Sequence, residues 1–161
     1  RECGRPLVVD ADALNLLARD PRPLPQAILT PHPGEAGRLL EVTTAEVQAD
    51  RFGAARRLAE RFHAVVVLKG AGTLVAAPGH GTAVIAAGNP GMAVGGMGDL
   101  LTGIIAALRA QGLSAFDAAA CGALLHGLAG DAAAIDGQRG LLPTDLLAPL
   151  RRLCNPDLAH A

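Results

Sequence analysis

Short apolar runs alternate with stretches of helical spacing along the first 70 residues of the chain. The apolar runs predict buried strands at residues 7–10, 28–30 and 64–68. Between them, helices are predicted at 11–19, 33–40 and 44–62, where Pro33 suits a first helical turn and Thr43 and Glu46 form a capping box. Strands that alternate with helices and are apolar almost throughout indicate a three-layer α/β fold with a mostly parallel sheet.

The rest of the chain begins with a hairpin pattern and continues with helices rich in alanine and leucine. Residues 74–77 and 82–87 flank Pro78–Gly81, which predicts two antiparallel strands joined by a turn. The helices expected after the hairpin cover about 99–111, 114–134 and a last segment from Thr144. No internal repeat or low-complexity linker interrupts these elements, so residues 1–161 are interpreted as one domain.

Composition excludes several classes of function. Half of the residues are hydrophobic and 18% are charged, which argues against disorder. A net charge of −1, with three Phe and no Trp or Tyr, argues against nucleic-acid binding. No apolar stretch is long enough to span a membrane, and no signal-peptide pattern opens the sequence. No C-x-x-C motif is formed by the three cysteines, Cys3, Cys121 and Cys154, which argues against a disulfide framework or a zinc site. This cysteine usage favours the reducing cytoplasm. Cys121 is expected to be buried in an apolar helix.

The predicted sheet is thin for a complete domain. The chain starts a few residues before a core strand, and only three central parallel strands are predicted. An apolar strand at the edge of a sheet promotes association with other chains. We therefore expect this chain to be the back part of a larger domain, and we expect it to form a homo-oligomer.

The segment Gly88–Asp99 contains five glycines in twelve residues and leads directly into an apolar helix. Glycines let backbone N–H groups approach a ligand, and the free N–H groups and dipole of a helix N-terminus attract anions. A carboxylate such as Asp99 would repel a phosphate there, unless it takes a proton from the group that the phosphate meets. The alternative interpretation is that Asp99 is only the N-cap of the helix.

Four segments at the predicted strand ends are expected to meet, because ligands of parallel sheets bind beyond the carboxyl ends of the strands. They are Asp10–Asn15, Thr30–Glu35, Lys69–Thr73 and the loop that ends at Asp99. In the third, Lys69 is the only lysine in the sequence, Gly70 and Gly72 would let the turn close around a phosphate, and Thr73 supplies a hydroxyl. A simple β-turn would show the same pattern, and no Walker motif is present.

Other polar residues at these strand ends leave two interpretations open. His32 lies between two prolines and is held rigidly, which suits a ligand contact, although a loop histidine is often only solvated. Asp10, Asp12 and Asn15 could orient a sugar or a magnesium-bound water, or they could cap the following helix. The remaining histidines share no metal-ligand spacing, and His126 is interpreted as a packed helix residue.

Five segments together resemble the ADP-dependent NAD(P)H-hydrate dehydratases, which have a ribokinase-like fold. They are VVDADALNLL, LTPHPGEAGRLL, VVVLKGAGTLVAAP, GNPGMAVGGMGDLLTGIIAAL and RGLLPTDLL, in the order of the family. The resemblance covers nearly the whole chain but lacks the family's N-terminal portion, so it implies a single truncated dehydratase domain. Met97 stands where the family usually has Thr, which removes one hydroxyl that could donate to a phosphate.

The resemblance also implies a metabolite-repair reaction. The family restores NAD(P)H from the S-form of its hydrate by coupling loss of the hydroxyl to cleavage of ADP, which gives AMP and phosphate. By motif, Lys69, Gly70, Ala71, Gly72, Thr73 and Gly98 would hold the nucleotide, whereas His32 and Asp99 would contact the hydrate. Asp99 would be the catalytic base, Mg²⁺ would neutralise charge on the transferred group, and no protein residue is assigned as a metal ligand. NAD(P)H-hydrate epimerase is the expected functional partner.

The sequence is also compatible with two other functions. A small-molecule kinase of the same fold would explain the glycine-rich loop and Asp99, but not the Thr30–Glu35 and Asp10–Asn15 segments. A nucleotide-binding remnant without activity would follow from the missing front portion. In the dehydratase interpretation, the chain is expected to be weakly active by itself and to gain activity when that portion is added back.

Overall fold

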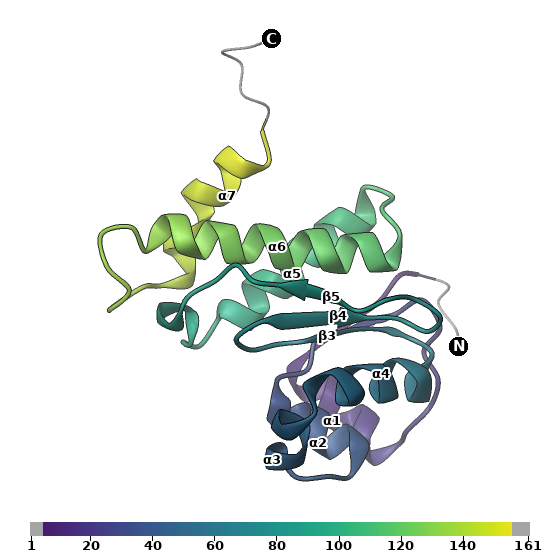
Figure 1. Ribbon diagram of the computed structural model, residues 1–161. Helices are drawn as coiled ribbons and strands as arrows, with labels where there is room; N and C mark the ends of the chain where they lie inside the picture. The colour runs from purple at the N-terminus through teal and green to yellow at the C-terminus, as the bar shows by residue number, and fades with distance from the viewer. Residues whose placement is uncertain (1–4, 156–161) are drawn as a thin grey trace.

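A mixed sheet of five strands runs through the computed structural model, which describes residues 5–155 (Figure 1). The first three strands pair in parallel, and the fourth is antiparallel to both of its neighbours, so four of the five strands point the same way. The mostly parallel sheet and the hairpin predicted from the sequence are therefore confirmed. In spatial order, which is also chain order, the strands are β1 (Val8–Val9), β2 (Ile28–Leu29), β3 (Val65–Leu68), β4 (Thr73–Ala76) and β5 (Ala83–Ile85).

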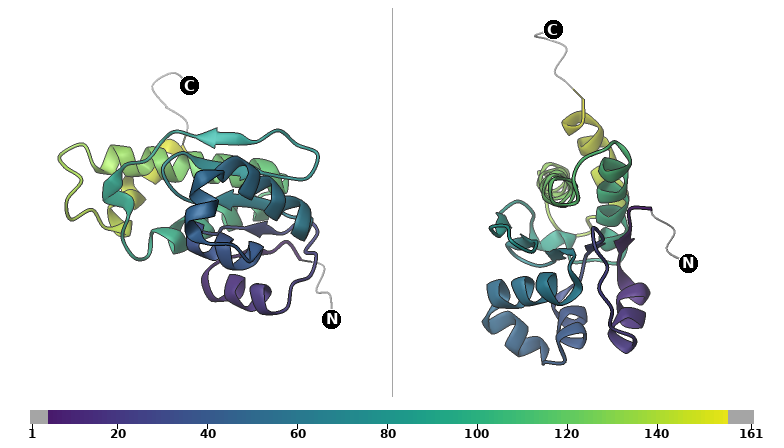
Figure 2. Two further views of the ribbon diagram at one scale, coloured as in Figure 1. Left: turned by 60° about the horizontal axis from the view of Figure 1, so that its bottom comes forward. Right: turned by 90° about the vertical axis from the view of Figure 1, so that its right-hand side faces the viewer.

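Helices cover both faces of the sheet and complete the three layers (Figures 1 and 2). One face carries α1 (Ala11–Arg19), α2 (Pro33–Leu40), α3 (Thr44–Ala49) and α4 (Arg51–Phe62). The other carries α5 (Met97–Ala110) and α6 (Ala115–Ala133), and α7 (Leu147–Leu153) packs on α6. Two short 3₁₀ helices, η1 (Pro90–Met92) and η2 (Pro143–Leu146), lie in the connecting segments.

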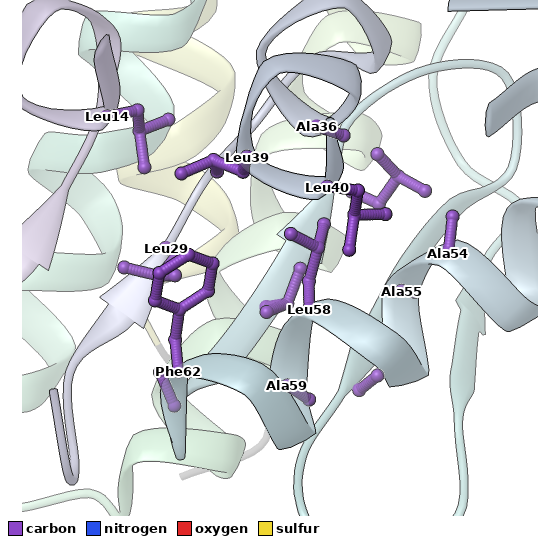
Figure 3. Packing of buried hydrophobic residues seen from close by; sticks show 14 of the residues in the cluster. Leu14, Leu29, Ala36, Leu39, Leu40, Ala54, Ala55, Leu58, Ala59 and Phe62 are labelled. Atoms are coloured by element: carbon purple, nitrogen blue, oxygen red, sulfur yellow. The ribbon is translucent and has the colours of Figure 1, made fainter. Parts of the chain in front are cut away.

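Successive strand residues supply two separate cores, because side chains alternate between the faces of a sheet. Val66 and Leu68 belong to the cluster under α1, α2 and α4, whereas Val65 and Val67 belong to the cluster under α5 and α6. Figure 3 shows side chains of the first cluster pointing into the space between sheet and helices, among them Leu14, Leu29, Leu39, Leu58 and Phe62. Both faces are thus fixed to helices, which holds the strand ends in place.

Three details differ from the sequence predictions. The helix expected over 44–62 is interrupted at Asp50, which ends α3 and then caps α4 by accepting a hydrogen bond from the Gly53 amide. Cys121 is exposed on α6 rather than buried. The last helical segment starts as the 3₁₀ helix η2 before it becomes α7. Cys3, and His160 among the remaining histidines, lie outside the described residues.

Among the helices of the described residues, none combines the length and the apolar character that crossing a bilayer requires.

Replacing Phe62 by Ala should lower the free energy of unfolding by about 3–5 kcal/mol, because its ring is 1% exposed in the first core. Phe52 on the same helix is 49% exposed, so Phe52→Ala is the matched control and should change stability by less than about 1 kcal/mol. Urea unfolding of the three proteins measures both values. Equal losses for the two variants would show that the core does not depend on Phe62.

Candidate active site at the carboxyl ends of the strands

The Lys69 ammonium lies at the centre of a charged cluster where the parallel strands end. Its Nζ is 2.8 Å from Oδ1 of Asp10, which follows β1, and 3.9 Å from Oε2 of Glu35, which follows β2. Lys69 itself directly follows β3. Three consecutive strand ends therefore contribute to one ionic group, as the parallel-sheet rule predicted.

Asp10 connects this group to α5. It occupies the N-cap position of α1 but makes no side-chain capping bond, so capping is not what its carboxylate does. Oδ2 instead accepts a hydrogen bond from Thr102 Oγ1 at 3.0 Å. Burial alone would raise the pKa of Asp10, but the hydrogen bond and positive charge of Lys69, together with hydrogen bonds from Thr30 and the Ala11 backbone, hold this pKa below its usual value.

His32 is held by the backbone at the start of α2 as well as by its flanking prolines. Its Nδ1 accepts hydrogen bonds from the amides of Gly34 and Glu35 at 3.0 and 3.2 Å. The buried Glu35 carboxylate completes a capping box by accepting from the His32 amide at 2.7 Å. Because Nδ1 is an acceptor here, the proton of a neutral imidazole lies on Nε2, which is 3.5 Å from Glu35 Oε1. The side chain is still 51% exposed and accessible to a ligand.

The Lys69–Thr73 loop turns sharply between β3 and β4. Gly70 and Gly72 have φ values of +139° and +63°, a region that side-chain-bearing residues rarely adopt. The Thr73 hydroxyl donates to the Gly70 carbonyl at 3.0 Å, so in this structure its proton stabilises the loop itself.

The glycine-rich segment delivers the N-terminus of α5 to the cluster. Gly96, with φ +86°, is the N-cap of α5, and Asp99 is the third residue of the helix. No side chain caps this helix, so the interpretation of Asp99 as an N-cap is wrong, and its exposed carboxylate is available for another role. A Cβ at Gly98 would lie 3.4 Å from both Asp10 Oδ2 and Lys69 Nζ, which shows how closely α5 approaches the ion pair.

A cleft of about 850 Å³ opens beside this cluster. Its wall includes His32, all of Lys69–Thr73 and Gly98, so residues from three of the four predicted segments line one cavity. Asp99 is not among its lining residues, although it follows Gly98 directly. Asp12 and Asn15 are not brought to the cleft: they line a separate groove, where Asn15 accepts a hydrogen bond from Arg38 at 3.2 Å.

Residues 1–152 match the family model described as NAD(P)H-hydrate dehydratase. The chain belongs to this family. It is 53% identical to the bifunctional NAD(P)H-hydrate repair enzyme Nnr of Escherichia coli K12 over 96% of its own length and 30% of the relative's. It is 52% identical to the ADP-dependent (S)-NAD(P)H-hydrate dehydratase of Neisseria meningitidis over 79% of its own length and 45% of the relative's.

A solved member of the dehydratase family has the same fold. The ADP/ATP-dependent NAD(P)H-hydrate dehydratase of Bacillus subtilis, co-crystallised with ATP/Mg²⁺, superimposes with a TM-score of 0.83 and 33% identity. The match covers 92% of this chain and 53% of that one, and it confirms the predicted ribokinase-like fold. The chain thus spans about half the length of this solved relative, and less than half of the two curated relatives.

Three residues of this dehydratase-family site were missed by the sequence analysis. Glu35 was noted only as part of a segment, and Thr102 was not singled out, although a Thr inside an otherwise apolar helix is a usable signal. His126 was interpreted as a packing residue, yet it lines the cleft. Gly127 and Gly130, which follow His126 on α6, let this helix pack closely against the segment after β5. A Cβ at Gly127 would come within 2.7 Å of the Ala87 carbonyl oxygen.

His126 is a neutral imidazole inside the cleft wall. Burial lowers its pKa to about 4, and its Nε2 is buried without a hydrogen-bond partner in the described part of the chain. The unfolded chain, with a histidine pKa near its usual value of 6.5, binds this proton at a higher pH than the folded protein does. The contribution of neutral His126 to the free energy of unfolding is therefore fully present above about pH 6.5 and is lost as the pH falls towards 4.

Between pH 6.5 and 4, the free energy of unfolding should fall by roughly 3 kcal/mol less in His126→Leu than in the wild type, because the titrating group is removed. Urea unfolding across this pH range measures the difference from the wild type. His63→Asn is the control: His63 is exposed, and Asn tolerates its left-handed backbone conformation. If the His126 variant and the wild type lost stability in parallel, the buried imidazole would not be the cause.

Proposed function

We propose that this chain carries the nucleotide site and the catalytic base of an ADP-dependent dehydratase for the S-form of NAD(P)H hydrate. The observation that carries the proposal is the convergence of His32, the Lys69–Thr73 loop and Gly98 on one cleft, next to an α5 first turn that presents Asp99. These residues come from three separate motifs of the sequence. The relatives from Neisseria and Bacillus are named as dehydratases dependent on ADP or on ADP/ATP.

The nucleotide phosphates would be bound mainly by backbone groups. Lys69 is already paired with Asp10 and has Glu35 nearby, so its ammonium does not offer a full positive charge to a phosphate. The N–H groups of the Lys69–Thr73 loop and the N-terminus of α5 supply further attraction for an anion. In this arrangement Lys69 positions the phosphates, and the loops supply much of the binding.

Magnesium fits this site as a companion of the nucleotide. In residues 5–155 no group of three His, Cys, Asp or Glu side chains is arranged to hold a metal ion. Mg²⁺ often binds proteins through one or two carboxylates and otherwise through phosphate oxygens and water. Bound to the phosphates, it would neutralise charge on the transferred group.

Asp99 would act as the base. It takes the proton of the hydrate's hydroxyl, whose oxygen then attacks the β-phosphorus and displaces AMP. The ring nitrogen next expels the new phosphate ester, and loss of a ring proton leaves NAD(P)H and inorganic phosphate. This role requires an accessible carboxylate that is not already consumed by an ion pair, and Asp99 meets this requirement whereas Asp10 and Glu35 do not.

The proposed reaction also indicates a partner enzyme for this protein. An enzyme that accepts only the S-form leaves the R-form unused, so an NAD(P)H-hydrate epimerase is its natural partner. We propose that the protein works in the cytoplasm as a homo-oligomer. Recovery of NADH absorbance from mixed hydrate epimers and ADP, with and without added epimerase, tests the reaction and the partner together.

Lys69→Ala should weaken ADP binding at least about tenfold, because it removes the ammonium and leaves two carboxylates beside the phosphate site. Calorimetric titration with ADP measures the effect. Arg38→Ala is the charge-matched control, since Arg38 lies at the other groove. Equal ADP affinity in the wild type and Lys69→Ala would reduce the Lys-Gly-Ala-Gly-Thr segment to a simple turn.

In an active protein that includes the family's N-terminal portion, Asp99→Asn should lower turnover by about 10²–10⁴-fold while ADP binding is kept or tightened. The amide has the size of the carboxylate but cannot accept the proton, and α5 should persist because Asp99 does not cap it. Asp117→Asn is a matched control, because Asp117 is likewise the third residue of its helix, α6, and does not line the cleft. A folded Asp99→Asn protein with near-wild-type turnover would rule out Asp99 as the base.

A further inference from the structure

Arg51, the first residue of α4, contacts the back of the Lys69–Thr73 loop. Its guanidinium donates to the carbonyl oxygens of Leu68 at 3.3 Å, Lys69 at 3.4 Å and Gly72 at 3.3 Å. Nη1 also donates to Gln48 Oε1 at 2.9 Å, which anchors the side chain from the other direction. One side chain thus bridges three carbonyls on both arms of a single turn.

The loop and the guanidinium fit one another closely. A Cβ at Gly70 would lie 2.9 Å from Arg51 Nη1, so a side chain at that position would displace the guanidinium from its present contacts. Gly70 also has φ +139°, which already favours glycine. The guanidinium therefore occupies the space that a larger residue in the loop would need.

The position of Arg51 determines which way the loop's peptide groups face. Arg51 is on α4, which covers the sheet face opposite α5 and α6 (Figure 1), whereas the cleft is lined by residues of α5 and α6. In a trans peptide the C=O and the following N–H point in opposite directions, and the described residues contain no cis bond. A Lys69 carbonyl held towards Arg51 therefore turns the Gly70 N–H away from α4.

We propose that Arg51 is a positioning residue that holds the Lys69–Thr73 loop with its carbonyls towards α4 and with the Gly70 N–H towards a bound phosphate. Arg51 draws partly negative carbonyl oxygens away from the anion site and leaves the Gly70 N–H there as a donor. The identity of the ligand as ADP rests on the function proposed above. The inference about loop orientation does not depend on that ligand, because it is drawn from the contacts of Arg51 with the loop carbonyls.

Arg51→Lys tests this inference, because an ammonium keeps the charge but cannot span three carbonyls as the planar guanidinium does. We expect ADP affinity to fall about tenfold and the KM for ADP to rise with kcat largely kept. In ¹⁵N NMR spectra, the amide signals of Gly70 and Gly72 should shift and gain mobility, whereas those of mid-strand Val66 should not. Arg56→Lys, an exposed change on the same helix, is the control.

Gln48→Ala provides a second, milder variant in case Arg51→Lys folds poorly. It removes an anchor of the guanidinium from an exposed position, and it should shift the same loop amides and weaken ADP about two- to threefold. If the wild type fails to bind ADP, the proposed function fails, and the loop amides still decide the role of Arg51. Loop amides and ADP affinity that change no more than in Arg56→Lys would overturn the inference.

Discussion

The ion pair between Lys69 and Asp10 fixes the relation between the sheet and α5. Asp10 follows β1 and Lys69 follows β3, so the 2.8 Å contact bridges two strands that do not pair with each other and spans the end of β2. Through its second oxygen, Asp10 also binds Thr102 on α5. Removal of Lys69 would leave the largely buried Asp10 carboxylate without its ion-pair partner, which is costly in a protein interior.

This ion pair also limits how the cleft can bind an anion. Two carboxylates, Asp10 and Glu35, lie close to the ammonium of the only lysine in the sequence and offset its positive charge. A phosphate placed there has to be attracted largely by backbone N–H groups, whose number and direction depend on loop conformation rather than on residue charge. The contacts of Arg51 with three carbonyls of the loop give a physical reason why those N–H groups hold their direction.

The sequence predicted the order and type of nearly all elements because each was encoded locally. Pro33, the Thr43–Glu46 capping box and the Pro78–Gly81 turn act over a few residues and are found where they were expected. The convergence of His32, Lys69 and Gly98 could be predicted as well, since parallel strands bring their carboxyl ends to one edge.

The errors concern features that only tertiary contacts decide. Asp50 interrupts a helix because its carboxylate binds the Gly53 amide, an option that helical spacing does not reveal. The exposure of Cys121 and the cleft position of His126 depend on how α6 is rotated against the sheet, and an almost uniformly apolar helix carries little periodic signal for that rotation. Likewise, the partner of Asp10 depends on which side chains meet at a crowded strand end.

Glu35 lies between His32, the proposed substrate contact, and Lys69, the proposed nucleotide contact, and it contacts both. Its Oε2 accepts the His32 amide at 2.7 Å and lies 3.9 Å from Lys69 Nζ, while its Oε1 is 3.5 Å from His32 Nε2. A carboxylate that is 6% exposed has little room to move, so the histidine and the ammonium are held at a set separation through it. The proposed reaction requires such a link, because a hydroxyl and a phosphorus atom react only when they are held close together and correctly oriented. The motif around His32 and the motif around Lys69 therefore act as one unit, although these two residues lie 37 positions apart in the chain.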